Sequence, residues 1–195
     1  MSVKERRERE RTRRHQLIVT AARNLAETEG WDAVTTRRLA ERIEYSQPVL
    51  YSHFSGKTAI VRAVALEGFA ELAATLRAGR SGVEEPEQAL TAIVRAYTEF
   101  ADANPALYDA MFTLDTDLPF GRDDTPPPLR AAFTELFQVA APLAQGSDAE
   151  TFTEVAWSAI HGLVSLSRSG RLRPEQSERR LELLVAQLRA IPAGA

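Results

Sequence analysis

The side chains best placed to do chemistry lie on one short helical pattern between Gln47 and Phe54. Leu50 and Phe54 are four residues apart, so both point inward toward a common core. A mainly polar set is left on the other faces: Gln47, Val49, Tyr51, Ser52 and His53. A surface of this kind offers hydrogen-bond donors and acceptors that can face a nucleic acid.

A second short helix is expected just before this one, and together they must position the polar surface. The spacing predicts a helix over 36–43, with Thr35 as its N-cap and an apolar face turned to the same core. Ser46 offers an N-cap for the second helix, and Pro48 in its first turn costs little because the N–H there has no helical partner. Two short helices that share one apolar seam predict a helix-turn-helix.

The stretch from Thr35 to Lys57 resembles the DNA-binding segment of the TetR (tetracycline repressor) family of bacterial regulators. The residues that match in identity and spacing are Thr35, Thr36, Arg37, Leu39, Ala40, Gln47, Pro48, Leu50, Tyr51, His53, Phe54 and Lys57. One position departs from the family, which usually has glycine in the turn where this chain has Glu44. If that position needs a positive φ, glutamate costs about 1 kcal/mol there, and we expect a strained turn.

The resemblance implies two classes of DNA contact. Arg37 matches a position that reaches a base edge, where arginine can pair with guanine, and Gln47 can pair with adenine. Pro48 and Val49 offer apolar contacts to a thymine methyl group. The positions that match phosphate contacts are Thr36, Tyr51, Ser52, His53 and Lys57. The alternative for Arg37 is a pair with a phosphate or with Glu41, four residues along the same helix.

The charge is divided unevenly along the 195 residues. The net charge is -3, but residues 1–57 hold 12 Lys and Arg against 8 Asp and Glu, whereas the remainder is acidic. A basic module joined to an acidic body is typical of a DNA-binding domain, expected here over 1–57, followed by a regulatory and dimerisation domain over 58–195. Uneven scatter is the plainer explanation.

The first fourteen residues carry seven basic side chains and three glutamates. Their apolar content is too low for a core, so we expect them either to be disordered away from DNA or to extend the first helix. They could lie along phosphates or enter a minor groove, and a solvated tail is an equally good explanation. An amphipathic helix follows, for which Gly30 is the expected C-cap.

From Lys57 onward the apolar pattern is helical throughout, so the predicted fold is all-α. A three-helix DNA-binding domain would precede a larger helical ligand-binding and dimerisation domain. We expect the last two helices, over 148–169 and 174–191, to form a homodimer. The stripe of Leu181, Leu184, Val185 and Leu188 would otherwise be half exposed.

Aromatic residues and methionine gather in the body and could line a pocket for a small apolar effector of unknown identity. The candidates are Tyr97, Phe100, Tyr108, Met111, Phe112, Phe133, Phe137, Trp157 and His161. Each taken alone is more simply explained as core. The segment from Trp157 to Gly162 resembles a TetR-family C-terminal domain of the tryptophan-histidine-glycine type. The plainer view is a core Trp157 and a hydrogen-bonded His161.

Little in the sequence favours an enzyme. There are three histidines and no cysteine, and no phosphate loop, nucleophile elbow or metal-ligand spacing, so we expect no catalytic residue, metal or cofactor. No apolar run reaches membrane-spanning length and no signal peptide is evident, so we expect a cytoplasmic protein with no membrane partner. The function expected is a ligand-responsive regulator, a repressor acting on double-stranded operator DNA. The alternatives are an activator, a helical interaction protein and an enzyme using His161.

Overall fold

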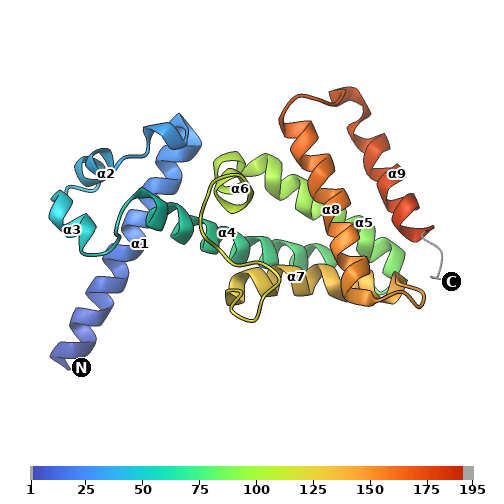
Figure 1. Ribbon diagram of the computed structural model, residues 1–195, viewed down its shortest axis with the longest axis horizontal. Coiled ribbons are helices and arrows are strands. Elements are labelled where there is room, and N and C mark those ends of the chain that lie inside the picture. The colour runs from blue at the N-terminus through green and yellow to red at the C-terminus, as the bar shows by residue number, and fades with distance from the viewer. Residues whose placement is uncertain (1, 191–195) are drawn as a thin grey trace. The chain divides into compact units, whose positions relative to one another are not determined.

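The structure is a computed structural model that describes residues 2–190, and all regular structure in that range is helical (Figure 1). The α-helices are α1 (Val3–Glu29), α2 (Thr36–Arg42), α3 (Gln47–Tyr51), α4 (Lys57–Arg80), α5 (Pro86–Ala103), α6 (Pro105–Phe112), α7 (Pro127–Ala140), α8 (Ala149–Arg168) and α9 (Ser177–Arg189). Short 3₁₀ turns are η1 (Trp31–Ala33), η2 (Ala141–Leu143) and η3 (Pro174–Gln176). The all-α prediction is confirmed. The expected end of the last helix, Ile191, lies outside the described residues.

The chain divides into two compact units. The first unit is Met1–Gly68 with Asn104–Pro126, and the second is Phe69–Ala103 with Pro127–Ala195. These units part within α4 and include α6 in the first unit, and the expected domain boundary after Lys57 stays a prediction. One reason why α6 belongs to the first unit is a close approach of α4 and α6 at Gly68, where a Cβ would lie 2.6 Å from the Met111 Sδ.

Helix α1 is longer than its apolar stripe requires because its first turn is capped. The Ser2 hydroxyl accepts a hydrogen bond from the Glu5 N–H at 3.2 Å, and the Glu5 carboxylate accepts from the Ser2 N–H at 2.8 Å. This capping box satisfies two N–H groups that have no helical partner. Gly30 ends the helix at φ 80°, as predicted. Of the two alternatives for the first fourteen residues, the structure has the helical extension.

Helix α6 is held in the first unit through its N-terminus. The Glu27 carboxylate of α1 accepts hydrogen bonds from the backbone N–H groups of Ala106 and Leu107, both at 3.0 Å. The Trp31 indole, which is buried, donates to the Ala106 carbonyl at 2.8 Å. A carboxylate at a helix N-terminus pairs with otherwise unsatisfied N–H groups and with the positive end of the helix dipole.

The second unit packs α7, α8 and α9 against α5. A buried carboxylate, Glu135 of α7, pairs there with Arg77 and Arg80 of α4, with a shortest distance of 2.7 Å to each. The stripe Leu181, Leu184, Val185 and Leu188 of α9 is buried by its own chain. The prediction that this stripe would be half exposed in one protomer is wrong, because α9 packs against α5 and α8 of the same chain.

Candidate nucleic-acid interface

The two short helices α2 and α3 are held by the apolar seam that the spacing predicts. Leu39 and Ala40 of α2 are buried, and so are Leu50 and Phe54 at and beyond the end of α3. Thr35 caps α2 by accepting a hydrogen bond from the Arg38 N–H at 3.2 Å. Burying one leucine side chain contributes about 1.5–3 kcal/mol, so the buried seam is enough to fix helices of this length.

The turn between these helices is a Schellman motif. The Tyr45 N–H donates to the Ala40 carbonyl at 3.0 Å, and the Glu44 N–H to the Glu41 carbonyl at 3.4 Å. Glu44 has φ 58°, the left-handed conformation that favours glycine. The strain expected from the sequence is therefore present.

The surface of α3 carries the side chains expected to face DNA. Gln47 and Pro48 are exposed, and Tyr51 is 54% exposed although it is aromatic. The Tyr51 hydroxyl lies 3.4 Å from the Thr36 hydroxyl, which joins two of the predicted phosphate contacts across the two helices. Val49 is half-buried and its carbonyl accepts from the Ser52 hydroxyl at 2.6 Å. Ser46 occupies the N-cap position, but its side chain makes no capping bond.

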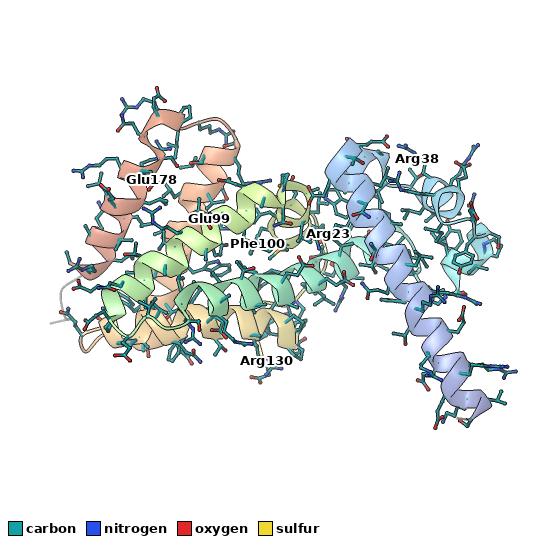
Figure 2. All side chains as sticks on the ribbon, turned by 180° about the vertical axis from the view of Figure 1, so that it is seen from behind. Arg23, Arg38, Glu99, Phe100, Arg130 and Glu178 are labelled. Atoms are coloured by element: carbon teal, nitrogen blue, oxygen red, sulfur yellow. The ribbon has the colours of Figure 1, made fainter. Side chains whose placement is uncertain are left out.

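The two charged side chains among the predicted DNA contacts, Arg37 and Lys57, also have partners within the chain. The Arg37 Nε donates to Glu41 Oε1 at 3.0 Å, and both side chains are largely exposed. This pair is the alternative expected for Arg37. The Lys57 ammonium donates to the Trp31 carbonyl. The roles of Arg37 at a base and Lys57 at a phosphate stay predictions. The neighbouring Arg38 lies between α2 and the end of α1 and pairs with Glu29 at 2.8 Å (Figure 2).

His53 is half-buried and surrounded by positive charge. Burial lowers its pKa below the ordinary 6.5, and the nearby His15, Arg11 and Arg14 lower it further. The His15 ring of α1 stacks on Phe54, which follows α3, with ring centroids 4.5 Å apart. Helix α1 therefore packs directly against the segment that follows α3. At neutral pH a neutral imidazole in this place can accept or donate a hydrogen bond.

A groove of about 620 Å³ runs between the start of α1 and the end of α3. Its lining is Arg6, Arg7, Glu10, Arg11 and Arg14 from α1, with Ser52 and His53. The sequence offers these arginines only as part of a basic segment that could lie along phosphates or be a solvated tail, and it places none of them beside α3. Their spacing of three and four residues, together with the Ser2 and Glu5 capping box, is the signal that could have placed them on one helical face.

The expected effector residues fall in both units. Tyr108, Met111 and Phe112 belong to the first, and the others to the second. In the second unit the Trp157 Nε1 donates to the Tyr97 hydroxyl at 3.2 Å, and that oxygen lies 3.4 Å from His161 Nδ1. His161 Nε2 lies 3.3 Å from the Ser165 hydroxyl. The hydrogen bonds expected in the plainer view of His161 are therefore present, and burial lowers the pKa of His161 below 6.5.

Two features of residues 2–190 bear on other functions. The described helices include none that is long and apolar enough to cross a membrane. The described His, Asp and Glu side chains form no group of three that could hold a metal ion.

The chain is similar to known regulators along most of its length. Residues 18–64 match the family described as bacterial regulatory proteins, tetR family, and residues 90–188 match a tetracyclin repressor-like C-terminal domain. An uncharacterised HTH-type transcriptional regulator of Mycobacterium tuberculosis is 30% identical over 161 residues, which cover 78% of this chain and 69% of that protein.

Two further proteins extend the comparison. The HTH-type transcriptional activator FasR of Mycolicibacterium smegmatis is 30% identical over 103 residues, covering 53% of this chain and 47% of that protein. A solved Rhodococcus protein of unknown function has a TM-score of 0.76 at 22% identity, covering 92% of this chain and 95% of that chain. At that identity the solved structure supports the fold alone.

Proposed function

The chain belongs to the TetR family of bacterial regulatory proteins, and from this membership we propose that it is a repressor that a small apolar molecule releases from its operator. Membership of this family indicates regulation of transcription through a helix-turn-helix. The observation that carries the proposal is the surface of α3, where Gln47, Pro48 and Tyr51 are exposed over a buried seam. An exposed aromatic ring there has no packing purpose within the described residues, and it fits a hydroxyl that donates to a phosphate.

Each half-site would be read in two ways. Arg37 would donate two hydrogen bonds to a guanine and Gln47 would pair with an adenine, while Pro48 and Val49 contact a thymine methyl group. The five phosphate contacts expected from the sequence, from Thr36 to Lys57, would fix the register of α3 in the groove. Arg37 would first have to break its ion pair with Glu41. An exposed pair at this spacing on a helix contributes about 0.3–0.5 kcal/mol.

A homodimer would place two copies of α3 on a near-palindromic operator. Since the α9 stripe is buried within the protomer, other apolar side chains must support the dimer. Val155 and Leu166 of α8 and Leu183 of α9 are each more than two-fifths exposed. Gly162 of α8 has open space beside it among the described residues, which leaves room for a partner helix to approach.

The effector would bind among the aromatic side chains of the body. The polar chain of Trp157, Tyr97, His161 and Ser165 would supply the few hydrogen bonds that orient an otherwise apolar molecule. A coupling of about 1–3 kcal/mol between the effector and DNA sites is typical and would be sufficient for regulation. The tryptophan-histidine-glycine assignment of this domain stays a prediction.

The test is binding of the purified protein to DNA upstream of its own gene, followed by two variants on an operator library. Arg37→Ala should lose affinity chiefly for the operator, so that one base position per half-site becomes tolerant, at a cost of about 1–3 kcal/mol. Lys57→Ala should weaken binding to all sequences alike and reduce the salt slope by about 1 per half-site. A uniform loss in Arg37→Ala, with every base preference intact, would refute the base assignment.

An activator is the second candidate, and the likeness to FasR favours it. Both candidates bind DNA through the same surface, so a reporter gene separates them. Deleting the regulator raises expression from the bound promoter if the chain is a repressor and lowers it if the chain is an activator. An interaction protein or an enzyme using His161 predicts no footprint on any duplex.

A further inference from the structure

The first turns of α1 are highly charged and bury no side chain, since the buried residues of this helix begin at Ile18. Figure 2 shows the side chains of these turns projecting into open space. Residues 1–14 carry seven basic groups, yet they are helical from Val3 and capped by Ser2 and Glu5. The seven basic groups outnumber three glutamates, so a capped helix that presents several arginines on one face favours a partner of opposite charge.

The groove between the start of α1 and the end of α3 gathers part of that charge. Arg14 is held there, since it pairs with Glu10 at 3.1 Å and its guanidinium lies 5.9 Å from the centre of the Tyr45 ring. The side chains of Arg6, Arg7 and Arg11 have no hydrogen bond or ion pair within residues 2–190. The groove therefore has one fixed guanidinium and three that are available to a ligand.

Ser52 and His53 form the other wall of the groove. Both are expected phosphate contacts of the helix-turn-helix, so a DNA strand that reaches them would continue into the groove. The positive charge of Arg11 and Arg14 is felt at His53, where it contributes to the lowered pKa. An anion in the groove would relieve this repulsion.

We propose that the groove between α1 and α3 binds the phosphates of the DNA strand beyond the bases that α3 reads. This inference rests on the proposed function, since it needs a duplex docked on α3. Guanidinium groups match phosphate oxygens with two parallel hydrogen bonds, and they bind without regard to base sequence. The groove would thus add affinity and lengthen the footprint without altering base preference.

The salt dependence of binding tests the proposal on the full chain. The probes are a duplex that the protein selects from a random pool and a duplex of mixed sequence. The variant is Arg7→Gln with Arg11→Gln, since glutamine keeps the helix propensity and removes two charges from the groove. The matched control is Arg9→Gln with Arg13→Gln, which removes two charges from the same helix outside the groove lining.

We expect the groove variant to reduce the slope of log affinity against log salt by about 0.9 for each phosphate that it no longer neutralises, or about 2 per half-site. The drop in affinity should be the same for both duplexes, and the protection of the outermost phosphates in a hydroxyl-radical footprint should disappear. The control variant should keep the outer protection and most of the slope. Circular dichroism checks that both variants retain the helix.

Four outcomes would overturn the inference. Equal slopes in the groove variant and the wild-type protein would show that the groove contacts no phosphate, while the proposed function stands. Equal changes in the two variants would assign the effect to net charge alone. Loss of binding to polyglutamate with unchanged duplex binding would assign the groove to an acidic protein. A wild-type protein that binds no duplex refutes the proposed function as well.

Discussion

The attachment of α6 to α1 can be tested by changing Glu27 to Gln. The Glu27 carboxylate accepts two backbone hydrogen bonds, from Ala106 and Leu107, both at 3.0 Å. Hydrogen bonds to a charged group contribute about 1.5–3 kcal/mol each. Glutamine keeps one oxygen acceptor but turns an NH₂ donor toward the second N–H. We therefore expect the free energy of unfolding of the first unit to fall by about 2–3 kcal/mol.

A matched control is available two residues along the same helix. Glu29 pairs with Arg38 at 2.8 Å, but both side chains are more than two-fifths exposed. Exposed ion pairs contribute about 0–1 kcal/mol, so Glu29→Gln should lower the free energy of unfolding by about 1 kcal/mol or less. Both changes remove the same charge from α1. Their difference therefore isolates the contribution of the two bonds to α6.

The assay uses the two tryptophans, one in each unit. In a Trp157→Phe background the remaining Trp31 donates to the Ala106 carbonyl, so its fluorescence reports on α6 directly. Urea unfolding at one protein concentration gives the free energy for each variant, because dimerisation would otherwise shift it. If Glu27→Gln and Glu29→Gln lower it equally, by less than about 1 kcal/mol, α6 is held by apolar packing and the reasoning is wrong.

Three further predictions also use urea unfolding followed by tryptophan fluorescence. Glu44→Gly should raise the free energy of unfolding by about 0.5–1 kcal/mol, because it relieves the left-handed conformation at φ 58°; a decrease would contradict the strain. Glu135→Gln should lower the free energy of unfolding of the second unit by about 2–3 kcal/mol, because Arg77 and Arg80 lose the charge of the buried carboxylate that they pair with. Glu178→Gln, in an exposed pair with Arg95, should lower it by under about 1 kcal/mol. Trp157 fluorescence in a Trp31→Phe background measures both. Burial lowers the pKa of His161, so below pH 6.5 the unfolded chain binds a proton more readily than the folded one. The free energy of unfolding should therefore fall as the pH drops from about 7 to 5. His161→Gln should make that fall shallower.

Helix ends were the most predictable part of the fold, because their signals are local. Thr35 accepts the capping bond expected of it at 3.2 Å, and Gly30 ends α1 as expected. The capping box of Ser2 and Glu5 is an equally local signal. It predicts that α1 begins at Val3, and the spacing of the arginines then places them on one face. The low apolar content of the first fourteen residues had left both points open.

Partners that are distant in sequence could not be predicted in this way. Nothing in the periodicity of α1 indicates that Glu27 meets the N-terminus of α6, 79 residues along the chain. The prediction for the α9 stripe was wrong for the same reason. An apolar face indicates that it will be buried, but not whether its own chain or a second copy covers it. Amphipathic patterns therefore predict helices and leave open which surfaces meet.

Arg37 and Lys57, the two charged residues predicted to contact DNA, can be compared by the energies of the pairs that they make within the chain. Arg37 pairs with Glu41, yet both side chains are largely exposed, with 78% and 63% accessible. An exposed pair at this spacing contributes about 0.3–0.5 kcal/mol, whereas a two-bond contact with guanine discriminates by about 1–3 kcal/mol. The contact of Arg37 with a guanine would therefore be more favourable than its ion pair with Glu41. Lys57 differs, since its bond to the Trp31 carbonyl is part-buried, and a phosphate must compete with it. By this comparison we expect Arg37 to release its partner within the chain for a DNA contact at a lower cost than Lys57.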